Sequence, residues 1–198
     1  MAYDKFNILT STAVPLPIEN VDTDQIIPAR FLKATERVGF GDNLFRDWRY
    51  NQDNTLKEDF VLNQDKFSGK ILVGGKNFGS GSSREHAAWS VYDYGFRCVV
   101  SSFFADIFRG NCLNIGVLPV QVSADFLQKI FDAVEADPSV ELEISLPEQK
   151  IVLLSTGESE SFDINGYKKN NMLNGFDDID YLLNIKKDIE TFAENTPL

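Results

Sequence analysis

The chain has 198 residues and 43% of them are hydrophobic, enough for one domain with a substantial core. Its formal net charge of −11 argues against nucleic acid as the main partner, because binding to phosphates needs a basic surface. The sequence contains no run of about 18 apolar residues and its first residues do not resemble a secretory signal, so we expect no membrane contact and a cytoplasmic protein.

The first third of the chain is expected to contain one strand followed by a long excursion. A strand is predicted over residues 6–14, with a turn at Pro15–Pro17 and then the segment 21–32 (VDTDQIIPARFL). Residues 33–68 are polar and aromatic, and we expect little regular structure in them. Excursions of this length are uncommon and are often functional.

The middle of the chain alternates between apolar strands and helices. Strands are predicted at residues 70–75, 97–101 and 116–122, and helices at about 84–94 and 103–111. Gly95 is placed to end the first of these helices, because glycine readily adopts the left-handed conformation found at helix C-termini.

The last part begins with an amphipathic helix over residues 123–137. Ser123 can cap it and Pro138 ends it. Its apolar face consists of Leu127, Ile130, Phe131 and Val134. A hairpin at 140–146 and 150–155, a short strand at 161–164 and a charged helical tail at about 177–194 follow. Together these elements predict a layered α/β domain with a mixed sheet.

The most informative segment is the glycine-rich turn at residues 77–86 (NFGSGSSREH), which leaves a strand and enters a helix. The first N–H groups of a helix have no internal partners, and the helix dipole adds positive character, so an anion is stabilised there. Gly79 and Gly81 allow the backbone to approach a ligand closely. The turn lacks the patterns of a Walker loop, a dinucleotide fingerprint and a hydrolase elbow.

Two interpretations of the polar residues in this turn remain open. In the functional one, the hydroxyls of Ser82 and Ser83 point at an anion and Arg84 binds a carboxylate through two parallel hydrogen bonds. In the structural one, Ser82 and Glu85 form a capping box and Arg84 is a surface residue. Spacing alone supports both equally.

The residues that commonly bind metals are scarce. Cys98 and Cys112 lack metal-ligand spacing, and His86 is the only histidine, so we expect two buried thiols and no metal site in this chain. A lone histidine is more often structural, although His86 could orient a carboxylate or a partner residue.

Several ordered segments resemble a known family. Residues 77–87 (NFGSGSSREHA) resemble the signature of the swivelling domain of the aconitase superfamily. Residues 21–32 and 104–111 (FADIFRGN) resemble the isopropylmalate dehydratase small-subunit family, and Gly39–Gly41 with residues 44–49 fits its bacterial form. The resemblance extends from about residue 5 to 180.

The resemblance implies a β/β/α swivel domain over residues 1–165, with a helical C-terminal extension, 166–198, packing on the same domain. It also implies a hydro-lyase of leucine biosynthesis that is active only as a heterodimer with a large subunit. In such families the large subunit carries a [4Fe–4S] cluster with one open iron, and this chain binds no cofactor itself. The substrate implied is a small dicarboxylate.

The resemblance assigns roles to individual residues. By position, Ser82 is the base that removes a proton from the substrate, Ser83 lies in the same anion site, and Arg84 binds a substrate carboxylate. Asp22, Thr23 and Asp24 shape the neighbouring loop or meet the partner, and the alternative role of the two aspartates is that of ordinary turn residues.

The segment 30–37 is the implied specificity loop. Phe31 and Leu32 suit an isopropyl group, with ordinary core packing an equal alternative. Lys33 lies near a position where relatives have an arginine, and Arg37 is close by. The nearest rival functions are those of small subunits acting on citraconate, methylmalate or homoaconitate. A non-catalytic anion-binding module is the rival from another class.

Overall fold

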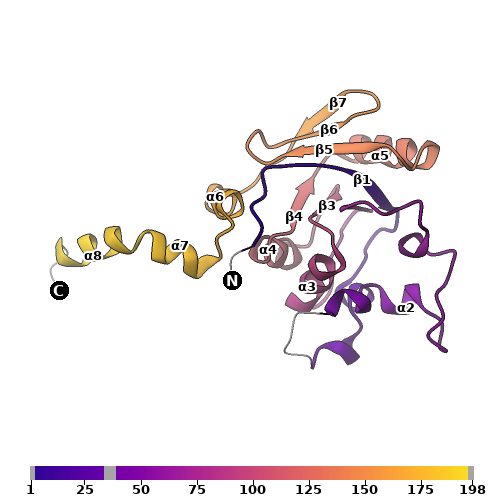
Figure 1. Ribbon diagram of the computed structural model, residues 1–198, viewed down its shortest axis with the longest axis horizontal. Coiled ribbons are helices and arrows are strands. Elements are labelled where there is room, and N and C mark those ends of the chain that lie inside the picture. The colour runs from indigo at the N-terminus through magenta and orange to yellow at the C-terminus, as the bar shows by residue number, and fades with distance from the viewer. Residues whose placement is uncertain (1–2, 34–38, 196–198) are drawn as a thin grey trace.

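A computed structural model describes residues 3–33 and 39–195 and shows one mixed sheet with helices on its faces (Figure 1). The seven strands of this described part lie in the order β4-β3-β2-β1-β5-β6-β7. Their bounds are β1 Ile8–Leu16, β2 Ile71–Gly74, β3 Cys98–Ser101, β4 Leu118–Gln121, β5 Glu141–Ser145, β6 Lys150–Leu153 and β7 Glu158–Ser161. The predicted layered α/β fold with a mixed sheet is confirmed.

Short helical segments cluster in the first third of the chain and longer helices follow. The short ones are α1 Thr23–Ile26, η1 Ala29–Phe31, η2 Phe40–Asn43, α2 Arg46–Arg49 and η3 Val61–Asn63. The longer ones are α3 Glu85–Tyr94, α4 Asp106–Asn114, α5 Ala124–Ala136, α6 Gly166–Asn174, α7 Asp178–Asn184 and α8 Lys186–Asn195. None of the helices in the described ranges is long and apolar enough to cross a membrane.

Strand β1 joins a parallel half of the sheet to an antiparallel half. Its first part, Ile8–Thr12, pairs antiparallel with β5, and its second part, Ala13–Leu16, pairs parallel with β2. Strands β2, β3 and β4 continue the parallel half. The carboxyl ends of parallel strands share one edge, which is where α/β proteins commonly bind ligands.

The alternation of side chains along the strands produces a core on each face of the sheet. Ile71 and Val73 of β2 belong to the cluster that contains α5, whereas Leu72 belongs to the cluster that contains α3. Successive strand residues point to opposite faces, so a fully apolar strand supplies both cores. This explains why the parallel strands are apolar at nearly every position.

Several local predictions are confirmed by these elements. The Ser123 hydroxyl accepts a hydrogen bond from the N–H of Phe126 at the start of α5 (3.1 Å). Gly95 ends α3 with a φ of 117°. The hairpin of β5 and β6 is present. The turn predicted to begin at Pro15 was wrong, because β1 continues to Leu16 and Pro15 lies opposite Val73.

The excursion predicted at 33–68 is more ordered than expected in its described part, residues 39–68. It forms η2, α2 and η3, and it buries Phe40, Leu44 and Phe45 in the core cluster that contains α3. Aromatic residues in a polar segment therefore anchor it to the domain.

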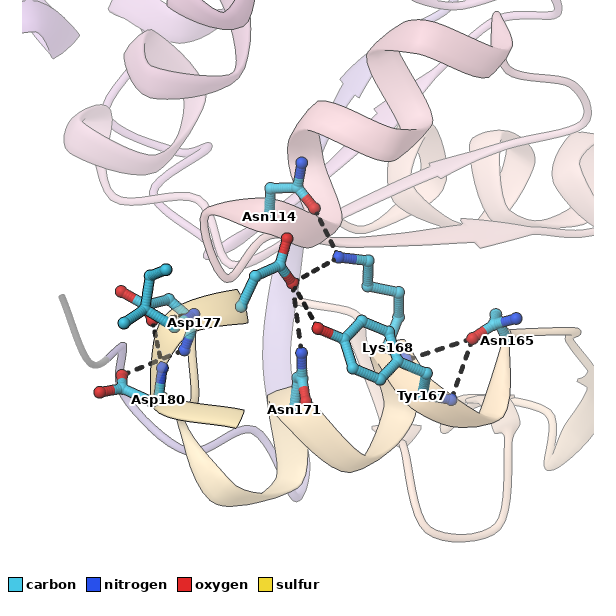
Figure 2. A network of polar contacts seen from close by, with 9 residues as sticks. Asn114, Asn165, Tyr167, Lys168, Asn171, Asp177 and Asp180 are labelled. Atoms are coloured by element: carbon cyan, nitrogen blue, oxygen red, sulfur yellow. Dashed lines mark hydrogen bonds and ion pairs between the residues drawn. The ribbon is translucent and has the colours of Figure 1, made fainter. Parts of the chain in front are cut away.

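The C-terminal helices differ in how they meet the body. Helix α6 buries Asn171 and Met172, whereas α7 and α8 have no buried residue and extend away from the sheet (Figure 1). Figure 2 shows the polar network at the root of α7, in which Asp178 accepts hydrogen bonds from Tyr167 (2.8 Å) and Lys168 (2.9 Å). The division of the chain at residue 165 stays a prediction.

Candidate active site

Two segments far apart in sequence lie side by side at the carboxyl edge of the parallel strands. We call residues 76–84 the site loop and residues 20–24 the brace. Their backbone bonds run from the N–H of Asn20 to the carbonyl of Lys76 (2.8 Å), from the N–H groups of Gly79 and Ser80 to the carbonyl of Val21 (2.8 and 3.1 Å), and from the N–H of Thr23 to the carbonyl of Ser80 (2.8 Å).

The two glycines of the site loop have the left-handed conformations that only glycine adopts without strain. Gly79 has a φ of 79° and Gly81 a φ of 88°. A Cβ on Gly79 would lie 2.2 Å from the ring of Phe108, so the loop is packed directly against α4. The close neighbour of Gly79 is thus a protein side chain, and the predicted close approach of the loop backbone to a ligand stays a prediction.

The capping-box interpretation of Ser82 and Glu85 is wrong. Helix α3 begins at Glu85, so Arg84 occupies the N-cap position and no side chain caps the helix. The Glu85 carboxylate instead accepts a hydrogen bond from the indole N–H of Trp89 (2.9 Å). Ser82 lies two residues before the N-cap, where a serine cannot act as the predicted cap.

Arg84 is paired with Asp24 of the brace. One guanidinium nitrogen, Nη2, donates to Oδ2 of Asp24 (2.9 Å), and Nη1 contacts Oδ1. The Arg84 side chain is 15% exposed, whereas that of Asp24 is 52% exposed. Arg84 is thus largely buried beside an open carboxylate, in a fixed orientation. Local sequence could not reveal this pair, since its members are 60 residues apart.

Ser82 and Ser83 are exposed at the end of the site loop. Within the described part of the chain, neither serine hydroxyl forms a hydrogen bond, although the Ser82 carbonyl accepts one from the Thr23 hydroxyl (2.8 Å). The backbone of Ser82 is therefore held while its hydroxyl stays open. Together with the first N–H groups of α3, this arrangement can receive a small anion.

His86 lies among aromatic rings on α3. Its ring centroid is 4.5 Å from that of Trp89 and 5.5 Å from that of Phe40. These contacts fit the structural role that a lone histidine most often has. His86 is two residues from Arg84 in the sequence.

The proposed specificity loop follows the brace closely. Phe31, in η1, and Leu32 are half-buried and pack against the core cluster that contains α3, whereas Lys33 is exposed. Arg30 forms a two-point ion pair with Asp47 and lies 4.7 Å from the ring of Phe31. Arg37 lies outside the described residues. The roles of Phe31, Leu32 and Lys33 stay predictions.

The described residues contain no group of three or more His, Cys, Asp or Glu side chains that could hold a metal ion. Cys98 and Cys112 are buried free thiols, as predicted. Burial raises the pKa of both thiols, and the proximity of Cys112 adds to the rise at Cys98. Buried thiols with raised pKa values do not fit a cluster-binding set, because cluster ligands are thiolates.

The sheet, the glycine-rich loop and the brace define an aconitase-type domain. The family model for the Aconitase C-terminal domain matches residues 3–125, and a second model, LeuD_N, matches residues 128–166. A solved structure titled 3-isopropylmalate dehydratase (leuD), from Methanocaldococcus jannaschii, superposes with a TM-score of 0.67 at 26% identity, covering 94% of this chain and 99% of that one.

Curated relatives narrow the class to one family. The chain is 63% identical to the 3-isopropylmalate dehydratase small subunit of Cytophaga hutchinsonii, over 98% of this chain and 96% of the relative. It is 60% identical to the small subunit of Christiangramia forsetii, over 96% of this chain and 93% of the relative. The chain belongs to the family of 3-isopropylmalate dehydratase small subunits, and the predicted family is confirmed.

Proposed function

We propose that this chain, assembled with a large subunit, interconverts 2-isopropylmalate and 3-isopropylmalate through 2-isopropylmaleate in leucine biosynthesis. The observation that carries the proposal is the open hydroxyl of Ser82 on a braced loop, next to the Arg84–Asp24 pair and the start of α3. The large subunit would carry a [4Fe–4S] cluster, which would supply Lewis-acid chemistry toward the substrate hydroxyl. A cytoplasmic location is part of the proposal.

Ser82 is the proposed base of the reaction. A serine hydroxyl is a poor base at its ordinary pKa and works only where its anion is stabilised. The positive end of the α3 dipole, at Glu85, and the Arg84 guanidinium are the positive groups that follow it directly in the chain. The proton removed from the substrate carbon would pass to the Ser82 oxygen and return when the alkene is rehydrated.

Arg84 is the proposed ligand of a substrate carboxylate, with Ser83 as a second contact. A guanidinium can bind one carboxylate on each of two edges, so Asp24 can hold Arg84 while the substrate binds beside it. The small exposed fraction of the Arg84 side chain limits competition from water. Asp24 is therefore a positioning residue for Arg84.

The apolar part of the substrate is proposed to meet Phe31 and Leu32. Their half-buried side chains suit an isopropyl group, and an unpaired carboxylate placed against them would be costly to desolvate. The loop should therefore reject substrates with a third carboxylate more sharply than it separates isopropyl from methyl, which differ by about 1–3 kcal/mol per methylene-sized group.

Reconstitution tests the activity. The purified chain alone should be inactive. After anaerobic mixing with the large subunit, 2-isopropylmaleate should be hydrated, and the loss of its ultraviolet absorbance measures this reaction. Citraconate should be a poor but measurable substrate. Turnover by the isolated chain, or none by the mixture while citraconate or homoaconitate is used well, would contradict the proposal.

Substitution of Leu32 tests the specificity loop. Leu32→Arg should lower kcat/KM for isopropylmalate and improve the ratio in favour of a substrate with a third carboxylate. Leu56→Arg adds the same charge at an exposed leucine of the excursion and is the matched control. If both variants leave the ratio unchanged, the loop does not recognise the side group.

A further inference from the structure

Thr23 makes two contacts with the site loop on either side of Gly81. Its backbone N–H donates to the carbonyl of Ser80 (2.8 Å), and its hydroxyl donates to the carbonyl of Ser82 (2.8 Å). The residue is only 2% exposed, so it lies beneath the loop and not at its surface. One residue of the brace thus holds both carbonyls that flank Gly81, the first through its backbone and the second through its side chain.

The hydrogen bonds of Thr23 matter for the geometry of the site because Gly81 lies between the two carbonyls that they bind. Glycine populates left-handed and right-handed conformations about equally, so its own backbone does not fix the direction of Ser82. In the structure Gly81 has a φ of 88°, and a Cβ on it would lie 3.3 Å from the side chain of Asp22 and 3.5 Å from the Thr23 hydroxyl. The brace therefore supplies the constraint that the glycine lacks.

The Ser82 carbonyl has the Thr23 hydroxyl as its hydrogen-bond partner within the described residues. A buried donor with a fixed backbone gives that partner a defined position: the N–H of Ile27 binds the Thr23 carbonyl (2.9 Å) and places Thr23 in the first turn of α1. The Thr23 hydroxyl thus connects the Ser82 peptide to α1, and the position of α1 fixes the orientation of that peptide.

We propose that the Thr23 hydroxyl is a positioning group for Ser82, holding the peptide of the base so that its side-chain oxygen faces the substrate. This inference rests on the proposed role of Ser82 as the base. Thr23 does not touch the substrate. A displacement of about 1 Å of a catalytic group can lower a rate roughly 100-fold, so the loss of this bond should act on the chemical step.

The variant that tests the role is Thr23→Val, which keeps the shape and removes the hydroxyl. In the assembled enzyme, kcat should fall about 10- to 100-fold while KM changes less than about 3-fold. Thr23→Ser restores the hydroxyl and should recover kcat to within a few-fold of the wild type. A substrate contact would instead raise KM, and a role in packing alone would not be rescued by serine.

The matched control is Ser90→Ala. Ser90 is fully buried in α3, and its hydroxyl donates to the Ala87 carbonyl (2.8 Å) within the same helix. This variant should lower the melting temperature by a few degrees, as Thr23→Val does, and leave both kcat and KM unchanged. A parallel fall in activity would mean that general destabilisation accounts for the Thr23 result.

A double-substitution cycle separates this inference from the proposed function. If Ser82→Ala abolishes most activity, adding Thr23→Val should lower the residual rate no further, because Thr23 acts through Ser82. If Ser82→Ala is inactive but Thr23→Val keeps wild-type kcat, only the positioning role is overturned. If Ser82→Ala itself stays active, the proposed base is wrong. Should Thr23→Val fail to fold, a folded Thr23→Ser with kcat more than 10-fold reduced would also overturn the inference.

Discussion

Among the described residues, the polar network at the C-terminal end of the domain and the one at the brace both join distant segments, and they differ in the groups that they leave without a hydrogen bond. At the junction of α6 and α7, which we call the C-terminal joint, Asp178 accepts hydrogen bonds from Tyr167 and Lys168, and Lys168 also donates to Asn114 (2.8 Å), so its charged groups bond to one another and to neighbouring side chains (Figure 2). At the brace, the bonds hold the backbone of the site loop and leave the Ser82 hydroxyl open. The count of hydrogen bonds is thus less informative than the reactive group that a network exposes.

The comparison predicts that substitution of Ser82 causes the largest loss of activity. Ser82→Ala should lower kcat by about 1,000-fold or more, a loss of about 4 kcal/mol in barrier at 1.4 kcal/mol per tenfold. The free energy of unfolding should change by less than about 0.5 kcal/mol, because no hydrogen bond of that hydroxyl is lost. Assays of the assembled enzyme and urea unfolding measure the two quantities.

Ser80→Ala is the control for this change in the same loop. The Ser80 hydroxyl makes only long contacts with the carbonyls of Asn20 (3.4 Å) and Val21 (3.5 Å). Its removal should leave kcat within a few-fold of the wild type. Equal losses in the two variants would mean that the loop as a whole, and not one hydroxyl, is sensitive.

A smaller effect is expected at Arg84. Arg84→Lys keeps the positive charge but loses the planar guanidinium, so it should raise KM by about 10- to 100-fold with a lesser change in kcat. Arg97→Lys, in which the side chain donates to the carbonyls of Tyr92 and Phe96 away from the brace, is the control. A normal KM for Arg84→Lys would show that Arg84 only pairs with Asp24 and does not bind a substrate carboxylate.

At the C-terminal joint the expected effect is on stability. The Asp178 side chain is 57% exposed, and exposed ion pairs are worth about 0.2–1 kcal/mol, so Asp178→Asn should lower the free energy of unfolding by about 0.5 kcal/mol. Activity in the assembled enzyme should be unchanged. A loss of activity with intact folding would show that the C-terminal joint affects catalysis. It would contradict the distinction between a structural network and a catalytic one.

The smallest effect is a dependence on pH at the same residue. The hydrogen bond from Lys168, followed by that from Tyr167, lowers the pKa of Asp178 in the folded chain. Its stabilisation is therefore complete above the ordinary carboxyl pKa of about 3.9 and is lost as the pH falls through the lower folded value. The stability difference between wild type and Asp178→Asn should be constant from pH 5 to 8 and shrink below about pH 4.

Sequence patterns predicted the features that depend on near neighbours. The Ser123 cap, the Gly95 stop and the hairpin of β5 and β6 all follow from residues within a few positions. The contacts at the start of α3 could not be predicted from neighbouring residues. The local pattern suggested a capping box at Ser82, but the Thr23 hydroxyl holds the Ser82 carbonyl and Asp24 pairs with Arg84 from 60 residues away. Tertiary contacts of this kind override local propensity.

The family resemblance identified the segments of the site but not their mutual contacts. It drew attention to Asp24 and Arg84 separately, and only the fold makes them an ion pair. For Thr23 the resemblance implied only a general role in shaping the loop or meeting the partner, because a threonine in a turn has many ordinary roles. Its buried position beneath Gly81 was the missing signal, and burial cannot be read from an isolated motif.

The sequence separation of the brace and the site loop has a consequence for how the chain folds. Thr23 and Ser82 are 59 residues apart, and their segments meet only when β1 and β2 pair in parallel. Closing so long a loop costs entropy before any contact repays it, and parallel pairings of distant segments form slowly. The catalytic edge should therefore be among the last parts of the domain to form, after local elements such as α5, and refolded chains should regain helical signal before they regain activity.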